Sequence, residues 1–275
     1  MKNTNIGFIG GGNMATSLIG GLIAGGVSEQ KIWVADPRSD QLERLKSHFS
    51  IHTSKNNDDI AQSVDVIVFA VKPQVMKTVA VGLADSVQKR KPLIITITAG
   101  IRGTDLSRWL GQNLPIVRSM PNTPALVQSG ATALFANSHV TLEQRDLAES
   151  IMRAVGLTLW VADEGMMDAV TALSGSGPAY FFLIMEALEQ AGQKLGLPKD
   201  TARLLTLQTA FGAAKMALES SEDVDTLRRY VTSPGGTTER AVNVLQDGHI
   251  QDLFTKALNA AYQRSIELAE KLGKE

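Results

Sequence analysis

Cysteine is absent from this 275-residue chain, and its absence removes several kinds of chemistry at once. Without thiols the protein forms no disulfides, no thiolate metal sites and no cysteine nucleophile. Histidine is scarce, and its four positions do not follow a spacing typical of metal ligands. We therefore expect no metal site and interpret the histidines as surface or loop residues: His48, His52, His139 and His249.

An excess of one charge and long apolar runs are also missing. Lysine and arginine number 27 against 28 acidic residues, which leaves a net charge of -1 and no basic stripe for nucleic acid. No stretch reaches the roughly 18 consecutive apolar residues of a membrane span. The first residues lead directly into a strand-like pattern, so we expect no signal peptide. These absences predict a cytoplasmic protein without nucleic-acid or membrane partners.

What the chain does contain, 44% hydrophobic residues over 275 positions, is enough for two domains. Residues 5–160 alternate between short apolar runs and helical stretches. The strand-like runs cover 6–9, 32–35, 66–71, 93–98, 116–118, 132–135 and 157–161, and the early helical stretches cover 13–24, 41–48, 58–63 and 74–88. Continuous apolar strands that alternate with helices predict a doubly wound α/β domain with a parallel sheet, which we place at 1–162.

The second half of the chain is different, because the strand pattern stops after Val161. Helical stretches at 163–172, 178–195, 199–219, 223–230, 237–246 and 250–272 predict an all-helical domain at 163–275. One helix is apolar around its whole circumference at 181–185, so it has to be covered on every side. A small domain covers such a helix poorly by itself. We therefore predict a homodimer through the helical domain; the alternative is a monomer with this helix at its centre.

A glycine-rich turn follows the first strand and opens the first helix. Gly10, Gly12 and Ala15 match the G-x-G-x-x-G/A pattern of dinucleotide sites, with Asn13 and Met14 between them. The first glycine permits the tight turn, the second lets the backbone approach a pyrophosphate, and the alanine lets the helix lie close to the strand. The helix N-terminus then offers N–H groups to the phosphates. The alternative is a glycine-rich turn without a ligand.

The residues after the second strand give conflicting signals about the cofactor. Asp36 lies where an acid binds the ribose hydroxyls of NAD, whereas Arg38 and Ser39 suit the 2′-phosphate of NADP. An acid in front of Pro37 can instead be a turn residue, which is the interpretation we favour. We therefore expect NADPH, with NADH as a possible second cofactor.

Further cofactor contacts are expected at the carboxyl ends of the strands, where open α/β sheets bind ligands. Asn56 suits the adenosine end of the cofactor, or simply the N-cap of the next helix. Lys72 is either a proton donor or an ordinary surface lysine, and the segment 120–124 is either a pocket wall or a structural turn. The cofactor residues predicted in this way are Asn56, Ala70, Val71, Lys72, Pro73, Ala99, Gly100 and Asn122.

Two loops in the helical half combine glycine with hydroxyl side chains. We interpret the first as a flexible loop, and the second as a neutral cradle of backbone N–H groups and hydroxyls for a small carboxylate. The alternative is ordinary capping of two helices. The predicted substrate residues are Ser174, Gly175 and Ser176 in the first loop, and Ser233, Gly235, Gly236, Thr237 and Thr238 in the second.

Taken together, the segments 6–15, 70–73, 120–124, 174–180 and 232–238 resemble those of pyrroline-5-carboxylate reductases. The resemblance covers almost the whole chain and is most specific at 233–238. It implies a Rossmann-like domain, a helical dimerisation domain, use of NADPH, the last step of proline biosynthesis, and dimers that assemble into a decamer. It further implies that Thr238 contacts the ring nitrogen of the imine and acts as the catalytic hydroxyl.

Other functions remain open at this point. β-Hydroxyacid dehydrogenases share the two-domain plan and resemble this chain in a glycine-rich loop that opens the helical domain. In that family a catalytic lysine follows the loop by one turn, whereas the next lysine here is Lys194. A cofactor-sensing regulatory protein would explain the glycine turn but not the second loop. A reductase of another small cyclic imine would differ by as little as one methylene in its substrate.

Overall fold

The computed structural model describes residues 3–274 and divides the chain into two compact units. Unit 1 comprises Met1–Ser176 together with Ala261–Glu275, and unit 2 comprises Gly177–Ala260. The change from strands to helices falls where the sequence indicates, because the last strand ends at Trp160. The compact units nevertheless divide at other positions. The boundary at 162 between a nucleotide-binding and a substrate-binding domain stays a prediction about function.

Unit 1 is built on one sheet of eight strands in the order β3-β2-β1-β4-β5-β6-β7-β8. The strands are β1 (Ile6–Ile9), β2 (Ile32–Ala35), β3 (His52–Ser54), β4 (Val66–Phe69), β5 (Leu93–Thr96), β6 (Ile116–Met120), β7 (Gly130–Ala136) and β8 (Gly156–Trp160). The strand order reverses between β1 and β4, which confirms the predicted doubly wound topology.

Two features of the sheet differ from the prediction. The sequence predicts no strand at β3, because its three residues are polar and give no apolar run. In addition, β7 runs antiparallel to β6, in a sheet that is otherwise parallel. Only the short 3-10 helix η2 (Thr123–Val127) separates these two strands. A parallel return needs a crossover of a dozen or more residues, so this connection forces the antiparallel pairing.

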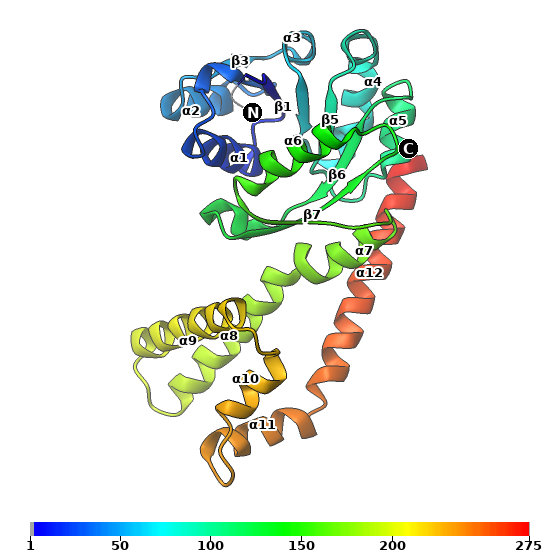
Figure 1. Ribbon diagram of the computed structural model, residues 1–275. Helices are drawn as coiled ribbons and strands as arrows, with labels where there is room; N and C mark the ends of the chain where they lie inside the picture. Colours follow the sequence, from blue (N-terminus) through cyan, green and yellow to red (C-terminus); the bar gives the residue numbers. More distant parts are fainter. Residues whose placement is uncertain (1–2, 275) are drawn as a thin grey trace. The chain divides into compact units, whose positions relative to one another are not determined.

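Helices cover both faces of the sheet (Figure 1). They are α1 (Asn13–Ala24), α2 (Ser39–His48), α3 (Asn57–Ser63), α4 (Pro73–Arg90), α5 (Gly103–Trp109) and α6 (Leu142–Arg153), with the short 3-10 helix η1 (Glu29–Lys31) before β2. Buried residues of α1 and α6 pack in the core on one face, and those of α3, α4 and α5 pack in the core on the other. Burying a Val, Leu or Ile side chain stabilises a fold by roughly 1.5–3 kcal/mol, so these two cores hold the strand ends in place.

The last part of the chain belongs to unit 1. The helix α12 (Ile250–Lys274) ends beside α5, where Arg108 donates a hydrogen bond of 2.7 Å to the carbonyl of Gly273 (Figure 1). Earlier in α12, the buried hydroxyl of Ser265 donates to Asp168 Oδ1 at 2.6 Å. These polar contacts explain why 261–274 packs with the sheet unit although it follows unit 2 in the sequence.

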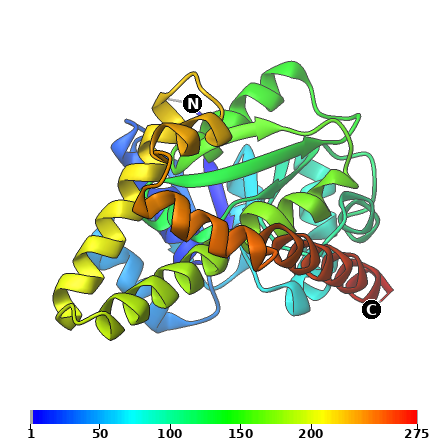
Figure 2. The same cartoon turned by 90° about the horizontal axis from the view of Figure 1, so that it is seen from below.

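Unit 2 is entirely helical. It contains α8 (Gly177–Lys194), α9 (Lys199–Glu219), α10 (Val224–Tyr230), α11 (Thr237–Asp247) and the start of α12. Helices α8 and α9 are joined by a short turn and contact one another (Figure 2). Within residues 3–274, no helix is long and apolar enough to cross a membrane.

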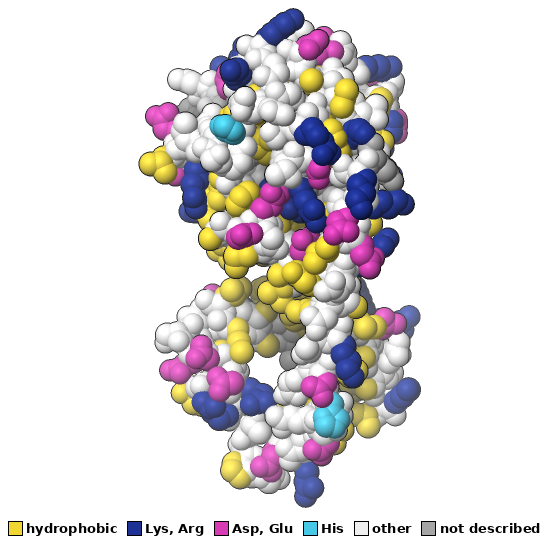
Figure 3. All heavy atoms as spheres, turned by 90° about the vertical axis from the view of Figure 1, so that its right-hand side faces the viewer, with side chains coloured by type: hydrophobic (Ala, Val, Ile, Leu, Met, Phe, Trp, Pro, Cys, Tyr) yellow, Lys and Arg dark blue, Asp and Glu magenta, His cyan; other side chains and the backbone are white. Residues whose placement is uncertain are grey.

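Many apolar side chains of unit 2 are exposed in the single chain. Figure 3 shows apolar side chains at the surface of this unit on one face of the molecule. Phe181, Phe182 and Leu183 on α8 are each about two-thirds exposed. Helix α8 is therefore not the centre of a self-contained monomer, and the monomeric alternative does not describe this structure. An apolar surface of this kind is typical of an oligomer interface.

Candidate functional site: a dinucleotide pocket and two glycine–hydroxyl segments

The glycine turn after β1 has the backbone geometry that its sequence predicts. Gly10 has a φ of +96°, and a Cβ atom there would lie 2.7 Å from the carbonyl oxygen of Ala70. A side chain is therefore excluded by both conformation and space. At Gly12 a Cβ atom would meet nothing within 4 Å, so this position faces open space. Ala15 is fully buried, where it lets α1 lie close to the sheet.

The start of α1 is suited to bind an anion. The helix begins at Asn13, and no side chain caps it at Gly12. The first N–H groups of a helix have no partner inside the helix, and the helix dipole adds partial positive charge there. Asn13 and Met14 lie in this first turn, as predicted. Open space at Gly12 beside uncapped N–H groups fits the pyrophosphate of a dinucleotide.

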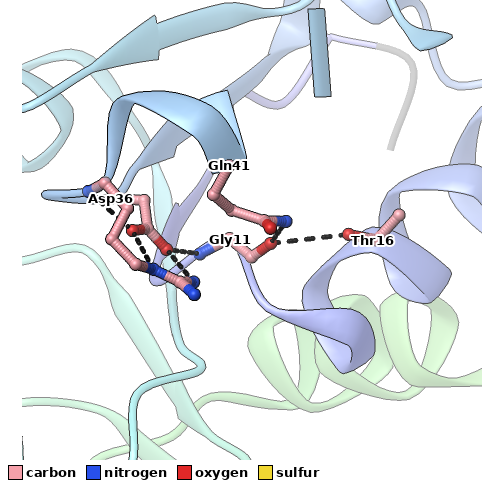
Figure 4. Close-up of polar contacts among 5 residues, drawn as sticks. Gly11, Thr16, Asp36 and Gln41 are labelled. Carbon is pink, nitrogen blue, oxygen red and sulfur yellow. Dashed lines mark hydrogen bonds and ion pairs between the residues drawn. The ribbon is translucent and has the colours of Figure 1, made fainter. Parts of the chain in front are cut away.

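Asp36 supports the turn rather than facing an open ribose site. Its carboxylate is buried and accepts a hydrogen bond of 2.9 Å from the Gly11 amide (Figure 4). It also accepts from Arg38, at 3.0 Å from the backbone N, 3.0 Å from Nε and 3.1 Å from Nη2. Burial alone would raise the pKa of Asp36, but the bonds from Arg38 and Gly11 together hold it below the ordinary value. The acid therefore stays ionised, as the favoured turn interpretation requires.

On the other side of the glycine turn, Gln41 holds the carbonyl of Gly11. The Gln41 side-chain amide donates to this oxygen, and the Thr16 hydroxyl, whose shorter bond of 3.0 Å goes to the Gly12 carbonyl, lies 3.5 Å from it (Figure 4). With Asp36 on the amide, both backbone polar groups of Gly11 are engaged by protein side chains. The turn is thus held in its conformation independently of a ligand, which reduces the ordering that binding requires.

A pocket of about 510 Å³ opens along the carboxyl ends of β1, β2 and β4. It brings together six of the predicted cofactor residues, namely Gly10, Gly12, Arg38, Ala70, Val71 and Lys72. Lys55 and Asn57 also line it and were missed, because both follow the unpredicted strand β3. Asn56 instead caps α3 by accepting from the Asp58 amide at 3.1 Å. A cofactor contact of Asn56 stays a prediction.

A second pocket of unit 1, of about 430 Å³, contains Pro73, Ala99, Gly100 and Ser176. The pocket is also lined by residues of the end of α12, a segment that no sequence motif connects with the site: Ala261, Arg264, Ser265, Leu268, Lys271 and Leu272. Gly100 has a φ of +71°, and a Cβ atom there would lie 3.3 Å from Leu272 Cδ1. No local signal marks the end of α12, since it reaches the pocket only through packing with α5 and the sheet.

The segment with Ser174, Gly175 and Ser176 is helical, so its interpretation as a flexible loop is wrong. Helix α7 (Met166–Val170) continues into the π-helical turn η3 (Thr171–Gly175). The Ser176 amide donates to the Thr171 carbonyl at 2.8 Å, and the Ser174 hydroxyl donates to the Val170 carbonyl at 3.0 Å. These bonds order the segment. Single π-helical turns occur often at functional sites, which is consistent with the predicted substrate role.

The segment after β6 packs against this π-helical turn. Asn122 donates from Nδ2 to the Ser174 carbonyl at 3.1 Å and accepts from the Ala131 amide at 2.9 Å. A Cβ atom on Gly175 would lie 2.5 Å from Met120 Cε, so the glycine admits this side chain. Two motifs that are about fifty positions apart in sequence thus support each other. Asn122 has a structural role here, and its contact with the cofactor stays a prediction.

In unit 2, the segment with Ser233, Gly235 and Thr238 leads into α11. Gly235 has a φ of +73°, and its amide donates to Glu239 Oε2 at 2.8 Å. The Gly236 amide donates to the Ser233 carbonyl at 3.0 Å, so it is not a free group of the predicted cradle. Thr237 and Thr238 begin the helix, which no side chain caps at Gly236. The amides of this first turn still suit a small carboxylate.

Glu239 is expected to keep this segment ordered. Replacing Glu239 by alanine removes the acceptor of the Gly235 amide, and we expect hydrogen exchange in the peptide 231–238 to accelerate about tenfold. Glu239→Gln keeps an acceptor at the same place and should exchange like the wild type. Glu219→Ala, an exposed acid on α9, is the matched control. Equal exchange in Glu239→Ala and the wild type would show that the hydrogen bond does not order the segment.

The ligand that uses a tight glycine turn, an uncapped helix N-terminus and a long pocket at a strand-order reversal is a dinucleotide. The fold and the site of unit 1 thus define a dinucleotide-dependent oxidoreductase of the Rossmann-like class. Residues 5–100 match the family described as NADP oxidoreductase coenzyme F420-dependent, in agreement with this class.

Comparison of the whole chain identifies the family. Residues 164–268 match the family described as pyrroline-5-carboxylate reductase dimerisation. A pyrroline-5-carboxylate reductase of Pseudomonas aeruginosa is 51% identical over 99% of this chain and 100% of its own length. One of Escherichia coli is 40% identical over 98% of both chains. The chain belongs to the pyrroline-5-carboxylate reductase family, and the resemblance seen in the sequence is confirmed.

Solved structures support the same assignment. A pyrroline-5-carboxylate reductase from Coxiella burnetii, 51% identical, matches with a TM-score of 0.93 over 97% of this chain and 98% of that one. A Plasmodium falciparum pyrroline carboxylate reductase with NADP bound, 29% identical, matches with a TM-score of 0.86 over 98% and 99% of the two chains. A 3-hydroxyisobutyrate dehydrogenase is only 12% identical at a TM-score of 0.51, so the β-hydroxyacid alternative shares the fold alone.

Proposed function

We propose that this protein reduces 1-pyrroline-5-carboxylate to L-proline with NADPH, the last step of proline biosynthesis. The observation that carries the proposal is the pairing, in one chain of this family, of a dinucleotide pocket with the Ser233–Thr238 segment. NADPH supplies the hydride when it is bound. The protein contributes binding, orientation and a proton to a reaction of this type.

Different residues of unit 1 bind different parts of the cofactor. The glycine turn and the first amides of α1 bind the pyrophosphate, and Arg38 with Ser39 faces the adenosine phosphate. Small residues after β4 and β5 leave room for the nicotinamide ribose: Ala70, Val71, Ala99 and Gly100. Pro73 begins α4 and stiffens the backbone beside them.

The residues of unit 2 hold the substrate. The amides of Thr237 and Thr238 and the Ser233 hydroxyl accommodate the substrate carboxylate. A substrate contact of Ser174, Gly175 and Ser176 stays a prediction of the sequence. The Thr238 hydroxyl donates a hydrogen bond to the ring nitrogen and passes a proton from solvent water to it, so that the carbon next to the nitrogen accepts the hydride. Lys72 is the alternative proton donor, and its place in the dinucleotide pocket favours a cofactor contact instead.

The assembly proposed for this enzyme is a homodimer through the helical unit. The exposed apolar face of α8 and the match of 164–268 to a dimerisation family support it. Assembly into a decamer and a cytoplasmic location stay predictions of the sequence.

The direct test follows the ultraviolet absorbance of NADPH after pyrroline-5-carboxylate is added to the purified protein, with proline measured as product. We expect rapid oxidation, slower oxidation of NADH, and a preference over the six-membered imine of roughly 10–200-fold, the usual value of one methylene. Tight NADPH binding without oxidation would contradict the reductase and favour a cofactor-sensing protein. Faster turnover of the six-membered imine would assign another ring size.

A further inference from the structure

The carboxyl ends of β2 and β3 place two charged residues side by side. The strands are parallel, with Ala35 opposite Ser54, and the Asp36 amide bonds to the Ser54 carbonyl at 3.2 Å. Asp36 and Lys55 are the next residues of the two strands, so they occupy neighbouring positions at this edge. Both line the dinucleotide pocket. The end of β2 is where Rossmann-like folds bind the adenosine ribose.

The negative charge at this edge is already balanced. Both carboxylate oxygens of Asp36 accept hydrogen bonds from Arg38, and one also accepts from the Gly11 amide. The acid is only 4% exposed, so it has little surface left to offer to the ribose hydroxyls. Arg38 in turn donates hydrogen bonds from Nε and Nη2 to this acid. The pair is therefore nearly neutral towards a ligand, and Arg38 alone is a weaker anion site than the sequence indicates.

Lys55 adds a positive charge that this pair does not cancel. Its side chain is exposed, and within residues 3–274 it forms no ion pair. The nearest acids along the chain are Asp58 and Asp59, and both accept hydrogen bonds from other groups. Asp58 accepts from the Ser86 hydroxyl at 2.6 Å, and Asp59 accepts from the Ser54 hydroxyl at 2.6 Å and from Asn56 at 3.4 Å. Asp36, Arg38 and Lys55 together leave a net positive charge at the end of the pocket that receives the adenosine ribose.

We propose that Lys55 binds the 2′-phosphate of NADPH and is a cofactor-specificity residue of this enzyme. The proposal rests on the dinucleotide site of the proposed function and extends it to a residue that the motif does not contain. A 2′-phosphate carries up to two negative charges; the Lys55 ammonium supplies one positive charge against them, and the remaining N–H groups of Arg38 supply hydrogen-bond donors. NADH has a hydroxyl at this position and gains nothing from the lysine.

The test uses binding of two fragments, 2′,5′-ADP and 5′-AMP, measured by calorimetry at low salt. For Lys55→Ala we expect the dissociation constant of 2′,5′-ADP to rise about tenfold and that of 5′-AMP to stay unchanged. Lys55→Arg should retain most of the affinity. Lys46→Ala, an exposed lysine on α2, is the matched control and should bind both fragments like the wild type.

Kinetics supply a second measurement. In Lys55→Ala the ratio of kcat/KM with NADPH to kcat/KM with NADH should fall about tenfold, and added salt should shrink the effect. Equal loss with both fragments, or no loss with 2′,5′-ADP, would overturn the role of Lys55. Because fragment binding needs no imine, it separates this result from a failure of the reductase proposal, which the turnover assay reports.

Discussion

Gly10→Ala is expected to remove cofactor binding and to destabilise unit 1. Gly10 has a φ of +96°, which costs a residue with a side chain about 1–2 kcal/mol. The new methyl group would also lie 2.7 Å from the Ala70 oxygen and 3.0 Å from the Ala70 carbonyl carbon. These are main-chain atoms next to a strand, so they cannot move aside as a flexible side chain can. We expect the free energy of unfolding to fall by about 2–4 kcal/mol.

The same displacement should weaken NADPH binding by at least about 100-fold, because a shift of this size moves the helix N-terminus away from the phosphates. Urea unfolding and a fluorescence titration with NADPH measure the two effects. Gly26→Ala is the control for backbone conformation alone, since Gly26 has a φ of +90° but open space around it. It should lose about 1 kcal/mol of stability and no affinity. Full NADPH affinity in Gly10→Ala would contradict the assigned site.

Gly12→Ala separates binding from stability. A Cβ atom at Gly12 meets nothing within 4 Å, and its φ is an ordinary -66°. The variant should therefore unfold like the wild type, whereas a methyl group in the space of the pyrophosphate should weaken NADPH strongly. Together the two glycine variants separate two requirements of the site: the turn conformation at Gly10 and the free space for the pyrophosphate at Gly12.

Thr238→Ala is expected to lower kcat/KM for the imine by about 10²–10³-fold, the range for loss of a positioned proton donor. Thr238 is the second residue of α11 and is half-buried, so its removal leaves the helix intact. The KM for NADPH should not change, because no residue of α11 lines the dinucleotide pocket. Steady-state kinetics with each substrate varied in turn measure both effects.

Two variants make the Thr238 result specific. Thr238→Ser keeps the hydroxyl and should recover most of the activity. Thr255→Ala removes a hydroxyl that bonds only to the Gln251 carbonyl on α12, and it should behave like the wild type. If Thr238→Ala turns over at the wild-type rate, the proton comes from elsewhere, and Lys72 becomes the first residue to replace.

Much of the cofactor site was predictable because its signals are local. Gly10 and Gly12 adjoin a buried strand and an opening helix, and the backbone geometry of such a turn depends on neighbouring residues. The same holds for the helices of the second half, whose composition and length need no distant contact. Pro37 beside Asp36 predicts that this acid is a turn residue, and its hydrogen bonds agree with that prediction.

The errors have a common physical cause. The segment 174–176 looked flexible because serine and glycine favour loops, yet hydrogen bonds and packing against Met120 hold it in a π-helical turn. Gly236 looked like a free donor, yet the turn at Gly235 directs its amide to Ser233. Propensities describe what a residue prefers on average, and tertiary contacts override them at individual positions.

The sequence by itself determined seven of the eight strands, the first four α-helices between them, the glycine turn, the helical second half and the family, because the signals for these features lie in neighbouring residues or in motifs along the chain. Only the tertiary structure decided that β7 runs antiparallel, that 261–274 forms a wall of a pocket in unit 1, and that Lys55 lies beside Asp36. These features depend on strand pairing and on packing between residues far apart in sequence, where no local pattern specifies which segments meet.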